Sequence, residues 1–137
     1  MRTVPLILAI VLLTFQLSAC TSSASQYSTD QVIAAFKDAG LEVNGERKLT
    51  SDDMGIAPMK FTEGVYFTTG DDHDVRVMSF KKKADLEDLK KFYDELGGVS
   101  ALFFFWTAAK GNILIVLSGD MEENQFNAFK SALESLK

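Results

Sequence analysis

Asp71-Asp72-His73-Asp74 is the one cluster in this sequence of 137 residues that looks like a set of metal ligands. It combines three carboxylates with the chain's single histidine. The spacing lacks the calcium-loop pattern, which needs a bidentate Glu at a fixed later position, and zinc sites usually combine several His or Cys side chains. Acidic residues beside Gly70 are also typical of a solvated turn. We therefore predict a hairpin turn here, with no metal site and no cofactor.

Catalytic residues are not apparent elsewhere in the sequence. Acid–base catalysis needs paired groups in one cleft, whereas the carboxylates here fall in the first turns of predicted helices and on solvated faces. A Ser or Thr nucleophile needs a neighbouring base, and His73 lies in the predicted turn. No Gly-rich phosphate-binding loop opens a helix. We predict that the protein is not an enzyme.

Cys20 is the only cysteine, so the domain that follows it has neither a disulfide nor a thiol nucleophile. It comes after a positively charged start, an apolar run at residues 3–17 and the small residues Ser18 and Ala19. This pattern is typical of a cleaved signal peptide, and the run is shorter than the roughly 20 residues of a membrane-spanning helix. An ordinary signal followed by a chance cysteine is the alternative. The absence of a disulfide partner argues against it.

The tetrapeptide Leu17-Ser18-Ala19-Cys20 resembles the lipobox of bacterial lipoproteins. The resemblance implies that Cys20 becomes the mature N-terminus and carries palmitate-like acyl chains. It divides the chain into a signal peptide (1–19), a lipidated tether (20–27) rich in Ser, Thr, Ala and Gln, and a single domain (28–137). The implied location is the extracytoplasmic face of the cell membrane, with attachment through the lipid anchor.

The charge of the domain limits the classes of partner. Removing residues 1–19 takes away Arg2 and no acid, so 14 basic residues become 13 against 19 acidic ones, and the formal charge changes from −5 to −6. An acidic protein of this kind is not expected to bind nucleic acid. Lys81-Lys82-Lys83, with Lys90 and Lys91, forms a local basic patch. It indicates either a solvated helix entrance or a contact with anionic lipid head groups or wall polymers.

Hydrophobic periodicity predicts an α+β domain with an antiparallel four- to five-stranded sheet and about three helices packed mainly on one face. Strand order stays open. The first helix begins at Ser28, with Gln31 completing a capping box, and ends at Gly40. The remaining predicted elements are a strand at 41–43 with a turn at Asn44-Gly45, a hairpin of 64–68 and 75–80, a helix at 84–96 ended by Gly97-Gly98, strands at 101–107 and 113–118, and a last helix capped by Asp120.

Two segments do not fit a simple helix or strand pattern. Residues 46–60 show neither period, and a loop of this length is often functional, although Met54, Ile56 and Met59 could instead fill the core. Residues 101–106 are apolar on both faces of the predicted strand. One face then needs cover from the 54–59 loop, a partner or a second copy. We expect Trp106 to be covered within the monomer.

Several motifs in the domain carry a second resemblance. They are Met54-Gly55-Ile56-Ala57-Pro58-Met59, Glu63-Gly64, Phe92-Tyr93-Asp94-Glu95-Leu96-Gly97, Trp106, Gly111-Asn112-Ile113-Leu114 and Gly119-Asp120. With them, residues 28–137 resemble small lipoproteins of unassigned function from Gram-positive bacteria of the Bacillus type, some of which are labelled "stress protein". Between Val65 and Arg76 the chain departs from the Pro/Gly-rich pattern of that group. The resemblance implies an extracytoplasmic lipoprotein and supplies no catalytic residue.

These observations favour a non-enzymatic binding or interaction module at the cell envelope, with a protein or a wall polymer as its partner. The alternative is a domain that binds or senses a small ligand in a pocket under the 46–60 loop. An enzyme is the least favoured of the three interpretations.

Overall fold

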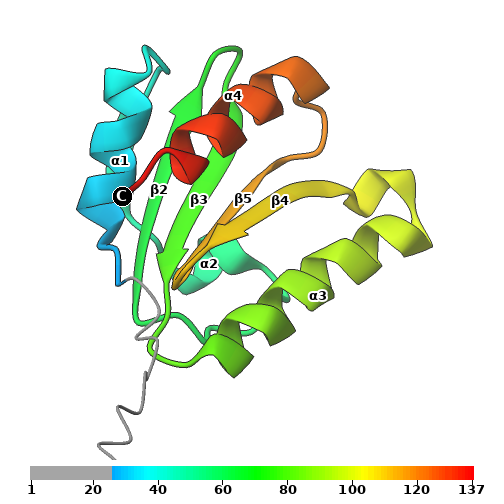
Figure 1. Ribbon diagram of the computed structural model, residues 1–137. Coiled ribbons are helices and arrows are strands. Elements are labelled where there is room, and N and C mark those ends of the chain that lie inside the picture. The colour runs from blue at the N-terminus through cyan, green and yellow to red at the C-terminus, as the bar shows by residue number, and fades with distance from the viewer. Residues whose placement is uncertain (1–25) are drawn as a thin grey trace, which may run out of the picture.

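The computed structural model describes residues 26–137, which form one antiparallel sheet with helices on both of its faces (Figure 1). The predicted α+β class with a four- to five-stranded antiparallel sheet is confirmed. The predicted signal peptide at 1–19, the predicted lipidation site Cys20 and most of the predicted tether lie outside the described residues.

The sheet has the strand order β1-β2-β3-β5-β4, with every neighbouring pair antiparallel. The central strands are therefore β3 and β5, and β1 and β4 form the edges. The elements are α1 (Thr29–Asp38), β1 (Asn44–Lys48), α2 (Ser51–Met54), β2 (Glu63–Thr69), β3 (His73–Ser79), α3 (Lys83–Val99), the 3₁₀ helix η1 (Ala101–Phe103), β4 (Phe105–Lys110), β5 (Ile113–Ser118) and α4 (Glu123–Glu134).

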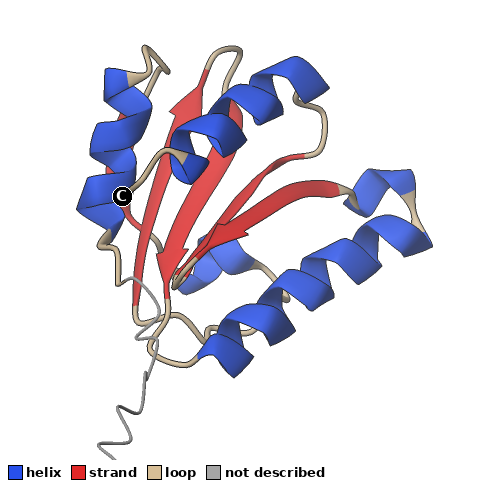
Figure 2. Cartoon of the chain, viewed as in Figure 1, coloured by secondary structure: helices blue, strands red, loops and turns tan. Residues whose placement is uncertain are grey.

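One face of the sheet is covered by α1 and α4 (Figure 2). Side chains alternate along a strand, so Val77 and Ile115 point to this side. They are fully buried in the same cluster as Phe36 of α1 and Phe129 of α4. The two phenylalanine rings meet edge to face with centroids 4.9 Å apart, which joins both helices above the sheet.

The opposite face is covered by α3 and, at its side, by α2. Met78, Leu114 and Val116 are fully buried here, against Leu89 and Tyr93 of α3. The helices thus divide between the two faces, whereas the sequence predicted that they lie mainly on one. The physical reason is that the central strands carry apolar residues at successive positions, so both of their faces need cover.

The N-terminal half follows the predictions closely except at β1. Ser28 and Gln31 form the predicted capping box, with the Ser28 N–H donating to Gln31 Oε1 at 2.9 Å and the Gln31 N–H donating to Ser28 Oγ at 3.2 Å. The predicted strand at 41–43 is wrong, because β1 starts at Asn44. The positive φ of Gly45 produces an irregularity inside the β1–β2 ladder and does not make the predicted turn.

The C-terminal half differs from prediction at three boundaries. The helix α3 continues through Gly97-Gly98 to Val99, and residues 101–103 form η1 where a strand was predicted. A Cβ atom on Gly97 would lie 3.0 Å from the Phe104 ring, so the glycine lets the chain turn back tightly against the helix. Asp120 does not cap the last helix. Glu122 is its N-cap residue, without a side-chain capping bond.

Gly119 lies very close to the backbone of Phe104. A Cβ atom at this position would lie 1.9 Å from the carbonyl oxygen of Phe104. The obstructing atom belongs to the backbone, so it cannot rotate away as a side chain can. The start of β4 and the segment after β5 therefore pack this tightly only with glycine at position 119.

We predict that Gly119→Ala lowers the free energy of unfolding by about 2 kcal/mol or more, because the added methyl group must displace backbone. Gly98→Ala is the matched control. Its Cβ would meet no atom within 4 Å, and alanine favours the helix, so stability should stay the same or rise by about 0.5–1 kcal/mol. Urea denaturation measures both. Equal effects of the two substitutions would contradict the proposed close approach.

Candidate functional site

A cleft of about 520 Å³ opens between α2 with the loop after it and the C-terminal half of α3. The walls are mostly apolar, and η1 and the start of β4 complete them. Met54 and Ala57 are buried beneath the loop, whereas Ile56 lies at the rim. Some side chains of residues 46–60 therefore fill the core, as one of the two interpretations predicted, and others border an open cleft.

Tyr93 forms the base of this cleft. Its ring meets Phe92 and Phe105 edge to face, with centroids 5.6 and 5.2 Å away. Its hydroxyl group lies 4.0 Å from the sulfur of Met54, and burial raises the pKa of the phenol. The aromatic contacts hold the base of the cleft in one arrangement.

Three large exposed apolar side chains, Ile56, Val99 and Phe103, line the cleft. All six large hydrophobic residues that are exposed within residues 26–137 come from the segments 56–59 and 99–104. Ile56 is 84% exposed, Val99 is 80% exposed and Leu102 is 90% exposed. Scattered exposed apolar residues are ordinary, but a contiguous group beside a cleft is typical of a binding surface.

Arg76 supplies a positive charge to the cleft from the central strand β3. Its Nε donates to the backbone carbonyl of Asp53 at 2.9 Å, and its Nη2 lies 3.8 Å from a carboxylate oxygen of Asp74. Its Nη1 is buried and has no hydrogen-bond partner among residues 26–137. The guanidinium carbon lies 5.7 Å from the ring centroid of Phe105. The arginine thus retains a donor that the described protein atoms do not satisfy.

Asp53 fixes the α2 wall of the cleft to the edge strand β1. Its two oxygens accept hydrogen bonds from the Arg47 guanidinium, each at 2.7 Å, and it also accepts from the N–H and the hydroxyl of Thr50 at 2.8 Å. The hydrogen bonds from Arg47, aided by those from Thr50, outweigh burial and hold the pKa of this carboxyl well below its usual range. Asp53 is therefore an ionised structural clamp.

Arg47 also begins a row of polar side chains that crosses the sheet beside the cleft. The strand register places Arg47 opposite Tyr66, and Tyr66 opposite Arg76. The Arg47 guanidinium lies 4.1 Å from the Tyr66 ring centroid. The Tyr66 hydroxyl donates to Asp74 at 2.5 Å, which raises the pKa of the phenol. Apart from Arg76 Nη1, these groups contact one another, and none of them forms an acid–base pair facing the cleft.

The side chains of the acidic cluster at 71–74 point to different partners. Asp72 has a φ of 62° in the turn between β2 and β3. His73 Nδ1 lies 3.3 Å from a carboxylate oxygen of Asp120, and Asp74 accepts the Tyr66 hydroxyl. Across residues 26–137, no three His, Cys, Asp or Glu side chains are grouped so as to hold a metal ion.

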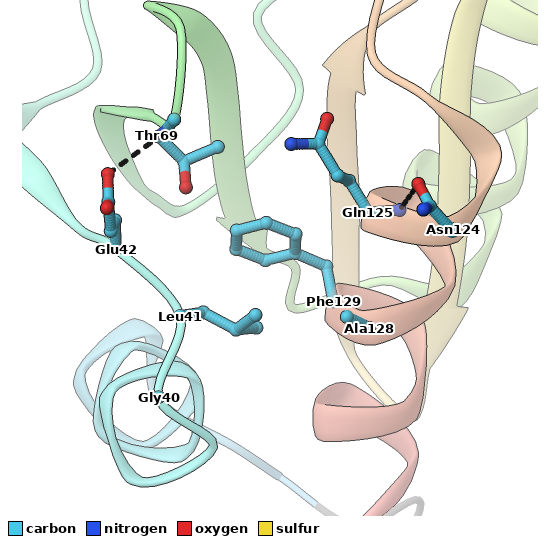
Figure 3. Close-up of a pocket in the computed structure, with 9 residues that line it drawn as sticks. Gly40, Leu41, Glu42, Thr69, Asn124, Gln125, Ala128 and Phe129 are labelled. Carbon is cyan, nitrogen blue, oxygen red and sulfur yellow. Dashed lines mark hydrogen bonds between the residues drawn. The ribbon is translucent and has the colours of Figure 1, made fainter.

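A second, smaller hollow of about 360 Å³ lies between the α1–β1 connection and α4 (Figure 3). Two of its polar side chains, Glu42 and Asn124, accept local hydrogen bonds. Glu42 accepts from the Gly70 N–H at 3.3 Å, and Asn124 accepts from the Gln125 N–H at 2.7 Å. Figure 3 shows the Phe129 ring pointing between these groups into the hollow. This arrangement offers no reactive pair.

The predicted basic patch is divided in the structure. Lys90 pairs with Asp94 at 2.7 Å and Lys91 with Glu95 at 3.6 Å, each one helical turn further along α3. Residues 81–83 lie separately at the entrance of α3. In the described part of the chain, Lys81 and Lys82 form no ion pair. No helix within residues 26–137 is long and apolar enough to cross a membrane.

Arg76 and Val99 were not predicted as functional residues. A signal for Arg76 was present, because a charged residue between Val75 and Val77 interrupts an otherwise apolar strand. Residues 101–106 were predicted to need cover on one face, but their place at the rim was not, because residues 101–103 were assigned to a strand.

We predict that Asp53→Asn lowers the free energy of unfolding by about 1–3 kcal/mol at pH 7 through loss of its charged hydrogen bonds. Because the folded pKa is depressed, this stabilisation is present above the unfolded pKa of about 4 and is lost as the pH falls through the folded pKa. The difference from wild type should therefore shrink below about pH 4. Urea denaturation from pH 7 to 3 measures it. Exposed Asp52→Asn is the control, and equal losses in both variants would argue against the clamp.

Comparisons with protein-family models, curated proteins and solved structures each gave no match for this chain. The resemblance to small Bacillus-type lipoproteins therefore stays a prediction. The function has to be argued from the cleft, its rim and the N-terminal sequence.

Proposed function

We propose that the protein is a non-enzymatic binding module, held at the extracytoplasmic face of the cell membrane by a lipid on Cys20. Its binding surface is the apolar cleft between α2 and α3, and its partner is an envelope protein that places apolar side chains in this cleft. The observation that carries the proposal is that three of the six exposed large apolar residues of the described domain, Ile56, Val99 and Phe103, line that cleft.

The composition of this surface fits a protein interface. The cores of such interfaces are depleted in charge and enriched in aromatic residues and Met, and their energy concentrates where side chains enter a pocket. Phe103 is 53% exposed at the mouth, next to Val99 and above the aromatic base. A partner that covers these side chains removes from water the apolar surface that the monomer leaves exposed.

The titratable groups of the cleft support binding over catalysis. Asp53 is held ionised by Arg47, and the Tyr93 phenol is held neutral by burial. General acid–base chemistry needs a group that exchanges a proton near the working pH, and these two do not.

The membrane attachment is supported by the lipobox-like sequence alone. We predict that Cys20→Ser abolishes fatty-acid labelling and releases the protein from the membrane fraction, because the acylated thiol is lost. Metabolic labelling and fractionation measure this. Ala19→Ser, which keeps a small residue before the cysteine, is the control and should remain labelled. Labelling that persists in Cys20→Ser would refute the anchor.

The cleft is tested by reversing its apolar character at the rim. We predict that the double variant carrying Ile56→Glu and Val99→Glu cross-links to the membrane partner at least tenfold less than the wild type, because each substitution places a carboxylate in an apolar interface. Both side chains are at least 80% exposed, so the melting temperature should be unchanged. Met59→Glu lies on the same loop outside the cleft and is the matched control. Equal cross-linking by the cleft variant and the control would contradict the proposal.

A small amphipathic ligand is the second candidate, and Arg76 is the observation that favours it. Its unsatisfied Nη1 beside an apolar cleft is suited to an anionic head group whose apolar part lies against Phe105. The volume of about 520 Å³ also lies within the usual range for ligand pockets. Native mass spectrometry of the purified protein separates the two candidates. A bound small molecule would increase the measured mass of the protein by its own mass. If the partner is a membrane protein, the purified domain alone should show no such added mass.

A further inference from the structure

We propose that the end of the domain formed by the start of α3 and the β4–β5 turn docks on the anionic surface of the bilayer, which turns the apolar cleft away from the membrane. The proposal rests on the lipid anchor of the proposed function. It commits to a lipid surface as the occupant because of where the tether joins the domain and which charges lie there.

The tether joins the domain beside the lysine cluster at 81–83. The Tyr27 N–H donates to the side-chain oxygen of Asn112 at 2.7 Å, and the side-chain nitrogen of Asn112 donates to the Tyr27 carbonyl at 2.9 Å. The Asn112 backbone carbonyl also accepts from the Phe80 N–H at 3.0 Å. Asn112 therefore connects the first residues of the domain to the residue directly before Lys81.

The length of the tether keeps this end close to the bilayer. Six residues, 21–26, separate Cys20 from Tyr27. Fully extended, the path from Cys20 to Tyr27 spans at most about 25 Å, and a flexible chain of that length has a typical end-to-end distance of about 15 Å. A tether this short gives the neighbouring surface a high effective concentration at the membrane, so a weak attraction is sufficient to orient the domain.

The charges at this end favour an anionic surface. Lys81 and Lys82 form no ion pair within residues 26–137, and Lys83 pairs with Glu87 of its own helix at 3.4 Å, with both side chains mostly exposed. Lys110 lies at the same end, against the Tyr27 ring and the last carbonyls of the chain. Acidic residues also lie near this end, since Glu63 lines the same hollow as Lys81, and Asp85 and Glu87 lie in the first two turns of α3.

These basic groups contact the bilayer first, although the domain is acidic overall. Acidic side chains elsewhere on the domain are screened beyond a Debye length of about 8 Å. A lysine at an anionic membrane surface is worth roughly a fivefold change in partitioning.

Docking at this end separates the membrane contact from the cleft. Figure 1 shows α3 starting near the β4–β5 turn and running away from it to η1. The helix has 17 residues and is therefore about 25 Å long. Val99 and Phe103 lie at its far end, where the exposed apolar rim faces an envelope partner and not the lipid.

The test uses two residues that occur once in the chain, Cys20 and Trp106. The chain from Cys20 to Lys137 is coupled through its thiol to a maleimide lipid in vesicles that also contain dansyl-labelled lipid. Trp106 lies four residues along β4 from Lys110, so docking keeps it within about 15 Å of the docked end of the domain. Without docking, the tethered domain also adopts orientations that place Trp106 further from the bilayer. Energy transfer from Trp106 should be higher on phosphatidylglycerol vesicles than on phosphatidylcholine vesicles. The difference should vanish in about 0.5 M sodium chloride.

Two charge-matched variants identify the surface. Lys81→Glu, Lys82→Glu and Lys83→Glu together should reduce transfer on phosphatidylglycerol to the phosphatidylcholine level. Lys37→Glu, Lys91→Glu and Lys130→Glu change the net charge equally and should keep the wild-type value. Equal transfer on both kinds of vesicle, or equal loss in both variants, would overturn the proposal. Because the coupling is chemical, that failure leaves the acylation of Cys20 and the cleft unaffected.

Discussion

The fold depends on the need to bury both faces of its central strands. Every residue from Ile113 to Leu117 in β5 is fully buried, and Val75, Val77 and Met78 of β3 are equally inaccessible. A sheet with such strands at its centre is stable only between two layers. The helices α1 and α4 complete the first layer. The second layer has one long helix, α3, with the short helix α2 and its loop at its side, and the cleft lies where these two meet.

The position of Arg76 shows how the incomplete second layer is stabilised. A charged side chain at the centre of a sheet is costly to bury without partners. The chain supplies the Asp53 carbonyl and the Asp74 carboxylate, and the same Asp53 binds Arg47 on the edge strand. Asp53 thereby holds the helix α2 in two ways, because its backbone carbonyl binds Arg76 and its carboxylate binds Arg47. A four-residue helix has little stability of its own and depends on such contacts.

Local signals predicted the parts of the fold that depend on neighbouring residues. The capping box at Ser28, the hairpin around Gly70 and the strand at 113–118 are of this kind, and each is present in the structure. Glycine was the main source of error. Gly97 and Gly98 were taken as the end of α3, although Gly97 serves the close packing of Phe104 inside a continuing helix. A close approach between distant residues leaves no periodic pattern in the sequence.

The candidate site was less predictable, because its residues meet only through the strand order. Arg47, Tyr66 and Arg76 become neighbours through the β1-β2-β3 register, which composition and periodicity do not determine. The 46–60 loop was identified as either functional or core-filling, and the structure assigns Met54 to the core and Ile56 to the rim. The far wall, at residues 99–104, required knowledge of where α3 ends.

The Asn112 side chain has a mechanical consequence for a protein held by its N-terminus. Any tension carried along residues 20–25 reaches the domain at Tyr27, where two hydrogen bonds to the Asn112 side chain lie side by side. The load is then shared with the turn between two sheet strands before it reaches the first turn of α1. For the lipid-anchored protein that we propose, this arrangement would transmit thermal motion of the bilayer to the sheet as a whole and would protect α1 from unwinding.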